Sequence, residues 1–480
     1  MKLNEERSFS SLEEVTRLLE DVEGKTFREI DETGRGVAAK NKGALGNIIE
    51  ESVLHYPINS DKEADILVGD TRYELKVTPL HHVGKGKGRL SAKERLVLDI
   101  INYFDLSEEE FETSQFWRKS KNIIVVYYCD DRADKKNQSR LDCRILKSIA
   151  LSYDPDDLAT IRRDWQAIHD KVAAGHANQL SESDTDYLAA CTKGESAKSV
   201  RKAPAPAGSS IENIMAKQRA FSYKASYMTS IAERALIKKL ACYELPMSDD
   251  QTLEQFISSK MEQFEGQSVL QIARALNMSV SSAKQSKAQL ALRILGTESK
   301  SVEHVSQFRK ANVTKLKTIV MYPDGEPKEH MSFRQITEEE WESLADSRED
   351  WEDSFLYRYF EENKFLFVPF ESPVPYKEHE AERDILRRGF LWNMPERDIQ
   401  EFVKPVWGKL HELMVSGRSV QYARGTNLLP GAAFNGVCHV RPKGKNGQDC
   451  VLLPNGESIT KQSFWLDRSY IASIVKASVE

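Results

Sequence analysis

The sequence predicts an α/β protein in which one arrangement of strands and helices occurs twice in tandem. Residues 65–76 carry β-forming side chains around Gly69-Asp70, a pair typical of a two-residue turn, and so predict a hairpin. Residues 123–128 form an uninterrupted apolar run, which indicates a central strand buried on both faces. Helices are predicted around these strands, at residues 11–21, 91–103, 155–176 and 181–190. Strands and helices that alternate along the chain are typical of the α/β class.

The length and composition of the chain restrict the kind of protein that it can be. With 480 residues the chain is long enough for two or three domains, each with its own core. Charged residues make up 30% of it and no long apolar run occurs, so we expect a soluble, cytoplasmic protein without a membrane span. The six cysteines lack CxxC spacing, which argues against a cysteine zinc site and a disulfide framework. Because the net charge is −6, any nucleic-acid-binding surface must be a local basic patch.

Asp65 and Glu74 face each other across the predicted hairpin. A turn centred on Gly69-Asp70 brings the two carboxylates to a Cβ separation of about 5 Å, where like charges repel. Lys76 lies two residues beyond Glu74, so its side chain leaves the same face of the strand. Paired carboxylates beside a lysine predict a site for Mg²⁺, which is commonly held by one or two carboxylates and a substrate phosphate.

Such a cation stabilises charge that develops on a phosphodiester and lowers the pKa of a bound water. Glu50, on a helix predicted from residue 42 onward, is a candidate third carboxylate. The alternative interpretation is a charged hairpin and a solvated helix face. Other segments of the chain bear on this choice.

Several short segments of the first half recur in the same order in the second half. The matching pairs are 24–30 with 266–272, Trp165 and Gly175 with Trp407 and Gly417, 191–194 with 438–443, and 217–231 with 461–474. An ordered series of matches predicts a duplication. We therefore expect a first domain at residues 1–240, a linker at 241–262 and a second domain at 263–480.

The second copy lacks the acids of the first. On this register Leu295 stands at the position of Glu50, and Lys315-Leu-Lys317 stands at that of Glu74-Leu-Lys76. Nine residues before Lys315, where the first acid would stand, the sequence has Ser306. The second domain is therefore predicted to be catalytically silent.

Spaced motifs in the first copy resemble a known family. They are Lys42-Gly-x-x-Gly-x-x-x-Glu50, Asp65…Glu74-x-Lys76-x-x-Pro79 and Glu112-Thr-Ser-x-x-x-x-Lys119. Together they resemble the MutH-type endonucleases. The segments beginning at Ser91, Cys191 and Lys217 are similar to the larger, duplicated branch of that family, the type II restriction enzymes that cut at GATC. The resemblance implies two restriction-endonuclease-like PD-(D/E)xK domains, each a mixed β-sheet flanked by helices, with Mg²⁺ at the acids of the first.

The resemblance also implies roles for individual residues. Asp65 and Glu74 would bind Mg²⁺, Lys76 would be the catalytic lysine, and Glu50 or its neighbour Glu51 would be the helix acid. Lys119 would act on the phosphate side. Contacts to double-stranded DNA are expected from Lys193, Arg201, Lys217, Arg219 and Lys224, and a second DNA site from Arg441, Lys443 and Lys461. Asp65 to Glu74 spans nine residues, where the family usually has seven, but two extra residues in a hairpin keep facing pairs in phase.

The leading hypothesis is a type II restriction endonuclease that makes Mg²⁺-dependent double-strand cuts, as a monomer when free and a dimer on DNA. A mismatch-repair-type enzyme that nicks at GATC is one alternative, but that branch has a single short domain. A non-catalytic DNA-binding effector is another, although the intact Asp65, Glu74 and Lys76 argue against it.

Overall fold

The computed structural model describes residues 8–34, 43–56, 64–83, 88–131, 139–193, 199–236, 242–248, 251–279, 285–421 and 427–479. The chain forms two compact units. The first comprises Met1–Ala241 with Lys310–Asn312, and the second comprises Cys242–Arg309 with Val313–Glu480. Both units combine β-sheets with helices, so the predicted α/β class is confirmed. In the described part of the chain, no helix is long and apolar enough to cross a lipid bilayer.

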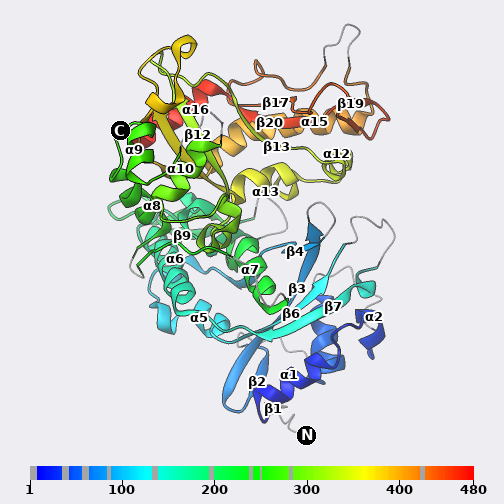
Figure 1. The fold of residues 1–480 in the computed structure, drawn as a ribbon. Helices are drawn as coiled ribbons and strands as arrows, with labels where there is room; N and C mark the ends of the chain where they lie inside the picture. The colour runs from blue at the N-terminus through cyan, green and yellow to red at the C-terminus, as the bar shows by residue number, and fades with distance from the viewer. Residues whose placement is uncertain are drawn as a thin grey trace, which may run out of the picture. The chain divides into compact units, whose positions relative to one another are not determined.

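The main sheet of the first unit is mixed, with strands in the order β1-β2-β3-β6-β7 and with β4 paired to β3 (Figure 1). Its strands are β1 (Ser8–Phe9), β2 (Ile66–Val68), β3 (Thr71–Val83), β4 (Arg89–Ala92), β6 (Ile123–Cys129) and β7 (Arg144–Ala150). β1 is parallel to β2 and β3 is parallel to β6, whereas β2 is antiparallel to β3 and β7 is antiparallel to β6. The predicted central strand is confirmed as β6, whose residues 123–128 are all buried between two neighbouring strands.

Helices cover the main sheet, with α1 and α7 on opposite sides of it in Figure 1. The helices of this unit are α1 (Leu12–Glu20), α2 (Phe27–Ile30), α3 (Ala44–Ile48), α4 (Tyr103–Leu106), α5 (Gln115–Ser120), α6 (Pro155–Ala173) and α7 (Ala225–Leu236). α1 begins at Ser11, whose side chain accepts a hydrogen bond from the Glu14 N–H, and it turns Val15 and Leu19 into the core. The helices predicted at residues 11–21 and 155–176 are thus confirmed as α1 and α6.

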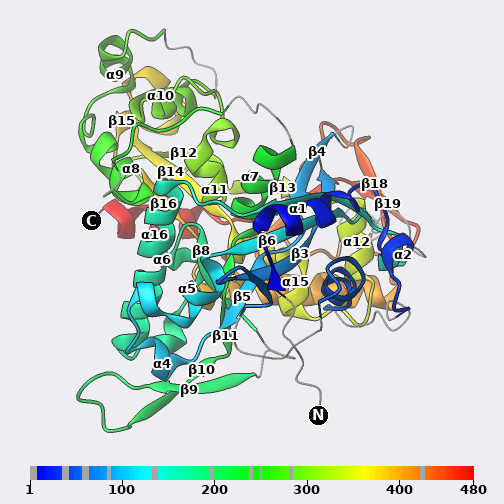
Figure 2. The same cartoon turned by 90° about the horizontal axis from the view of Figure 1, so that it is seen from below.

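A second sheet of the first unit has the order β5-β11-β8, from β5 (Leu96–Ile100), β11 (Arg219–Tyr223) and β8 (Leu188–Thr192). It corrects two predictions: residues 91–103 and 181–190 are not helices but contain β5 and β8. Local residue types such as Lys93, Glu94 and Arg95 favour a helix, but pairing with β11 more than 100 residues away decides the outcome. Two further strands, β9 (Val200–Pro204) and β10 (Asn213–Lys217), form a ribbon at the edge of this unit (Figure 2).

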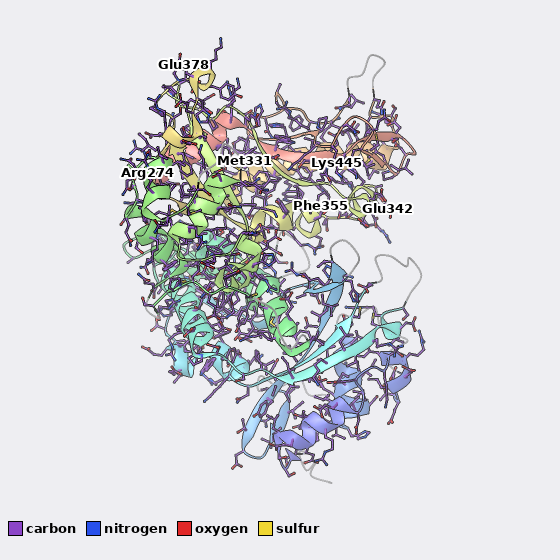
Figure 3. All side chains as sticks on the ribbon, in the orientation of Figure 1. Arg274, Met331, Glu342, Phe355, Glu378 and Lys445 are labelled. Carbon is purple, nitrogen blue, oxygen red and sulfur yellow. The ribbon has the colours of Figure 1, made fainter. Side chains whose placement is uncertain are left out.

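The second unit also has a main sheet and a smaller sheet. The main sheet consists of β12 (Val313–Met321), β14 (Lys364–Glu371), β15 (Ile385–Leu386) and β16 (Phe390–Trp392); the smaller one of β13 (Met331–Gln335), β20 (Gln462–Leu466) and β17 (Cys438–Pro442). A ribbon of β18 (Cys450–Leu452) and β19 (Ser458–Thr460) completes it. The longer helices are α8 (Leu253–Glu262), α9 (Val269–Ala275), α10 (Ser286–Ile294), α12 (Glu338–Leu344), α13 (Phe355–Glu362), α15 (Lys404–Ser416) and α16 (Arg468–Val479). Figure 3 shows the side chains of this unit, including Met331 on β13 and Phe355 on α13.

Strand pairing follows the same pattern in the two units. β12 is parallel to β14, as β3 is to β6, and β20 lies between two antiparallel neighbours, as β11 does. Individual hydrogen bonds also correspond. The Gly24 N–H donates to the Ile145 carbonyl and the Gly266 N–H donates to the Leu386 carbonyl, both at 2.9 Å. Helices α2 and α9, which follow these two glycines, both begin with a capping box.

The segment predicted as a linker is partly ordered in the second unit. Residues 253–262 form α8, which buries Leu253, Phe256, Ile257 and Met261. Four apolar side chains at helical spacing need a core to cover them, so these ten residues belong to the unit that follows. The linker prediction is therefore wrong for α8.

Candidate active site

The hairpin that carries the predicted acids forms with the predicted register. Ile66 pairs with Tyr73 and Val68 with Thr71, and the turn residue Gly69 has a φ of 55°, which favours glycine. Asp65 comes directly before β2, and its Oδ2 accepts a hydrogen bond of 3.0 Å from the Leu75 N–H. The first acid is thus fixed against the strand that carries the second.

Glu74 and Lys76 leave the same face of β3. Glu74 is buried, with 5% of its surface exposed, and burial raises the pKa of its carboxyl above the ordinary value. The Lys76 ammonium lies 2.5 Å from Glu74 Oε1 and opposes that rise. A carboxylate and an ammonium are therefore held together at a partly buried point of the sheet, and their opposite charges compensate each other.

Glu50 lies beside these groups, on the π-helical turn Ile49–Val53 that continues α3. Burial raises the pKa of Glu50 to about 7, and repulsion from Asp65 and Glu74 adds to this effect, while Lys76 opposes it. Charge interactions of this kind require the four groups to be close neighbours. Glu50 therefore lies close to the other two predicted acids, and a π-turn is a common feature of functional sites.

Lys119, at the end of α5, also approaches the acids. It lowers the pKa of Glu74, and its ammonium lies 3.1 Å from Asp99 Oδ1. Asp99 belongs to β5 and was not among the predicted site residues, because the sequence assigned its segment to a helix. Residues 96–100 are Leu-Val-Leu-Asp-Ile, and this short, mostly apolar run is the signal that could have indicated a strand.

The acid set suits a hard divalent cation. Glu50, Asp65 and Glu74 bring carboxylate oxygens into a partly buried site where their charges repel, and Lys76 and Lys119 offset part of this charge. Oxygen ligands and excess negative charge are what Mg²⁺ requires. The residue types present therefore fit such a cation.

The predicted DNA-contacting residues divide into two groups. Lys193, at the end of β8, and Arg201, on the β9–β10 ribbon, are exposed, and Lys217 is half-buried at the end of β10. Arg219 is buried and donates to the carbonyls of Ala190 and Leu180, at 2.6 and 2.5 Å. The prediction that Arg219 contacts DNA is wrong, because its guanidinium is committed to the interior.

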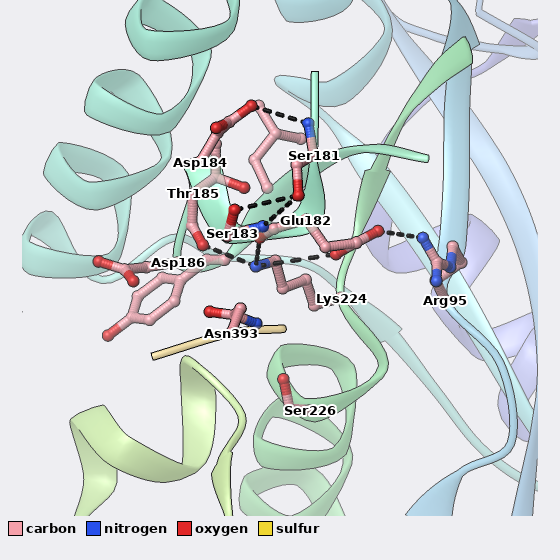
Figure 4. Close-up of polar contacts among 12 residues, drawn as sticks. Arg95, Ser181, Glu182, Ser183, Asp184, Thr185, Asp186, Lys224, Ser226 and Asn393 are labelled. Carbon is pink, nitrogen blue, oxygen red and sulfur yellow. Dashed lines mark hydrogen bonds and ion pairs between the residues drawn. The ribbon is translucent and has the colours of Figure 1, made fainter. Parts of the chain in front are cut away.

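Lys224 is a second correction. Its buried ammonium donates to the carbonyls of Glu182 and Thr185, and lies 3.7 Å from Glu182 Oε2 (Figure 4). The other carboxylate oxygen of Glu182 pairs with Arg95. The basic residues of this segment are visible in the sequence, but the burial of Lys224 is not. Two cations around one buried carboxylate neutralise it and close this end of the second sheet.

The three basic residues predicted for a second DNA site have different environments. Arg441 is exposed, with its guanidinium 5.5 Å from the centre of the Trp465 ring. Lys461 pairs with Asp449 at 2.7 Å on the surface. Lys443 is half-buried and donates to the Phe333 carbonyl at 2.5 Å, so it connects β17 to β13.

The chain is similar in sequence to known DNA-cleaving and DNA-repair proteins. A family model described as "DNA mismatch repair enzyme MutH" matches residues 54–164, a range that holds Asp65, Glu74, Lys76 and Lys119. The type II restriction enzyme Sau3AI of Staphylococcus aureus is 29% identical to the chain, over 98% of this chain and 99% of that enzyme. The chain is therefore similar to MutH in residues 54–164 and, over nearly its whole length, to a type II restriction enzyme.

A second relative matches only one part of the chain. The DNA mismatch repair protein MutH of Shewanella woodyi is 25% identical over 47% of this chain and 92% of that protein. The similarity to the restriction enzyme therefore extends over nearly the whole chain, whereas the similarity to the mismatch repair protein extends over about half of it.

Proposed function

We propose that this protein is a type II restriction endonuclease that makes Mg²⁺-dependent double-strand cuts in DNA at a short palindrome, GATC. The observation that carries the proposal is the group Glu50, Asp65, Glu74 and Lys76, placed together in the part of the chain that matches the MutH family or directly before it. The match to a type II restriction enzyme over nearly its whole length supports the reaction class. GATC is the sequence that the resemblance to the duplicated branch implies.

In this mechanism Asp65 and Glu74 hold Mg²⁺, which when bound supplies charge stabilisation at the phosphodiester and a more acidic water. The hydrogen bond from the Leu75 N–H orients the Asp65 carboxylate. Lys76, fixed 2.5 Å from Glu74, directs its ammonium at the attacking water or the scissile phosphate. Hydrolysis breaks the bond between phosphorus and one ester oxygen and forms a bond from phosphorus to the water oxygen.

Glu50 and Lys119 complete the set of residues. With a pKa near 7 in the absence of metal, the Glu50 carboxyl exchanges a proton readily at neutral pH, which suits it to take a proton from water. Lys119, held at 3.1 Å by Asp99, adds positive charge on the phosphate side. Lys193, Arg201 and Lys217 then supply contacts to the DNA backbone and bases.

We propose further that the second unit is a catalytically silent copy of the first. The shared order of strands and the corresponding hydrogen bonds of Gly24 and Gly266 support a duplication. At the catalytic positions the second unit has other contacts: Lys315 pairs with Glu303 at 2.6 Å, and Lys317 donates to the Ser332 carbonyl at 2.6 Å. Leu295, in place of the helix acid, is fully buried.

A silent copy can still bind DNA. Arg441, exposed on β17, is the residue of this unit best placed to contact a phosphate or a base edge. We propose that the second unit binds a second GATC duplex and favours the cleavage-competent state of the first. Such an effector acts only if it binds the active state more tightly than the inactive one.

Digestion of a plasmid of known sequence tests the reaction and its target. With Mg²⁺ the protein should give linear fragments whose sequenced ends all fall at GATC, and with EDTA it should give none. Nicked circles without linear product would favour the mismatch-repair alternative. Binding without any strand cleavage would favour the non-catalytic effector. A single-site plasmid with an added uncleavable GATC duplex then tests the effector role, because acceleration at low duplex concentration is expected before competition at high concentration.

A further inference from the structure

The second unit contains a group of metal-binding side chains that the nuclease mechanism does not use. His330, His439 and Asp467 each offer one ligand atom, and these atoms all lie within 4.8 Å of one another. The three residues come from the ends of neighbouring strands. His330 precedes Met331 of β13, labelled in Figure 3, His439 belongs to β17, and Asp467 follows β20. Because β20 pairs with both β13 and β17, the sheet itself brings the three together.

His439 is the unusual member of this group. Only 1% of its surface is exposed, and among the described residues neither of its ring nitrogens has a hydrogen-bond partner. Buried polar groups are nearly always satisfied, so an imidazole with two unsatisfied nitrogens requires an explanation. Its ring meets that of His330 at 4.9 Å between centroids, edge to face. The buried ring is therefore directed into the group that contains the other two side chains.

The hydrogen bonds of His330 are in conflict without a further ligand. Its Nδ1 is 3.2 Å from the Arg468 N–H, which makes Nδ1 an acceptor, and 3.2 Å from Asp467 Oδ2, which is also an acceptor. One proton cannot satisfy both contacts of a single ring nitrogen. A cation bound by Nδ1 and Asp467 Oδ2 would replace both of these contacts, because the nitrogen has a single lone pair.

We propose that His330, His439 and Asp467 form a binding site for a divalent transition-metal ion, with Zn²⁺ as the best match. Two imidazoles and one carboxylate are a common zinc ligand set, which leaves one coordination position for water or another donor. Mg²⁺ prefers oxygen ligands and fits this set poorly. The ion joins β13, β17 and β20 to the start of α16.

A second histidine group, in the first unit, serves as an internal comparison. His82 Nδ1 lies 2.7 Å from Asp131 Oδ2, and the Cys129 thiol donates to the same oxygen at 3.2 Å. This group is partly exposed, and unlike His439 its His82 Nδ1 and Cys129 thiol have partners within it. It therefore serves as the comparison for the group around His439.

Metal content tests the proposal independently of cleavage. The full-length chain is prepared in an Asp65→Ala background, so that the catalytic acids do not bind the added ion. After incubation with ZnCl₂ and gel filtration, elemental analysis should find about one zinc per chain. Zinc should also raise the Tm by roughly 5 °C, because a ligand bound only to the folded state stabilises it.

Two substitutions remove the site in different ways. His439→Phe keeps a buried aromatic ring but removes both nitrogens, and Asp467→Asn keeps the side-chain shape but removes the charge. Both should lose the bound zinc and the rise in Tm. His411→Phe, at a histidine of the same unit outside the group, and Cys129→Ser should retain them. If His439→Phe fails to fold, Asp467→Asn alone decides the matter.

Several outcomes would overturn the proposal. No zinc after gel filtration, or zinc retained by Asp467→Asn, would show that the group does not bind the ion. Loss of zinc from Cys129→Ser but not from Asp467→Asn would place the ion in the first unit. A His439→Phe variant with unchanged zinc content and a higher Tm would show that the ring only fills space.

Discussion

The two units share a parallel pair of strands in the main sheet and a three-stranded antiparallel sheet, but these strands carry different side chains. In the first unit the central parallel pair carries Glu74 and Lys76 at 2.5 Å, beside Glu50 and Asp65. At the corresponding strand of the second unit, Lys315 and Lys317 are directed to Glu303 and to the Ser332 carbonyl. Similar strand pairs thus carry a group of acids in one unit and lysines with other partners in the other, and on our proposal this difference separates the catalytic unit from the silent one.

The ends of the two three-stranded sheets also carry different side chains. Where β5, β8 and β11 end, the buried carboxylate of Glu182 is neutralised by Arg95 and Lys224 (Figure 4). The matching ends of β13, β17 and β20 carry His330, His439 and Asp467 instead. In the first unit this end of the sheet carries an ion triad, Glu182 with Arg95 and Lys224. In the second unit it carries the proposed metal site.

The largest expected effect concerns the acids. Asp65→Ala or Glu74→Ala should reduce single-turnover cleavage of a GATC duplex by about 10³-fold or more, because the metal and the charge stabilisation that it provides are lost. DNA binding, measured with Ca²⁺ in place of Mg²⁺, should change little. The matched control is the double variant Lys315→Ala/Lys317→Ala. An equal loss of cleavage in that control, with DNA binding intact, would mean that the second unit does the cutting.

The ion triad predicts a large effect on stability. Glu182 is 2% exposed, and Glu182→Ala would leave Arg95 and Lys224 as uncompensated charges. Loss of one partner of a buried ion pair costs about 3–5 kcal/mol of the free energy of unfolding. Denaturant unfolding measures this cost. Glu112→Ala, which removes an exposed pair with Arg162 in the same unit, should have little effect. Similar stabilities for the two variants would contradict the assignment of Lys224 to the interior.

Glu50 predicts a pH-dependent effect on stability. Its pKa is raised from 4.5 to about 7, so the folded state holds a proton that the unfolded state has released. The folded, metal-free protein should therefore lose stability as the pH rises from about 4.5 to 7, by as much as about 3 kcal/mol. Glu50→Gln should remove this loss, so that it stabilises the protein at pH 8 but hardly at pH 5. Chemical denaturation in EDTA at the two pH values provides the measurement, and a constant difference between variant and wild type would refute the prediction.

The smallest expected effects concern Arg441 and Lys443, whose substitution should have different consequences. Arg441→Ala should abolish the few-fold acceleration by an effector duplex and leave the basal cleavage rate unchanged. Lys443→Ala should instead lower the stability of the second unit slightly, by about 1 kcal/mol, because the Phe333 carbonyl loses one donor and keeps the Ser463 hydroxyl. If Arg441→Ala responds to the effector as wild type does, the second unit is a scaffold.

Local patterns in the sequence predicted the hairpin, its register and β6 correctly. The Gly69-Asp70 turn and the alternation beside it act over a few residues, and so does the apolar run at 123–128. The π-turn that presents Glu50 and the strand that presents Asp99 could not be predicted in this way. β5 forms because it pairs with β11, and that partner is distant in the sequence.

The sequence patterns also did not predict which charged side chains are buried. Arg219 and Lys224 lie in a basic, aromatic segment that is typical of DNA contacts, yet both point into the first unit. Lys193 and Arg201, from similar segments, remain exposed. The difference depends on which carbonyls and carboxylates surround each cation, and these come from distant parts of the chain.

The central claim is that the catalytic metal binds to the first unit and not to the corresponding strands of the second. Fe²⁺ in place of Mg²⁺, with ascorbate and peroxide, generates radicals that cut the polypeptide beside the bound ion. The account predicts new fragment ends close to residues 50, 65 and 74–76, suppressed by excess Mg²⁺ and absent in Asp65→Ala. Fragment ends at residues 306–317 that persist in Asp65→Ala and disappear with excess Mg²⁺ would contradict it.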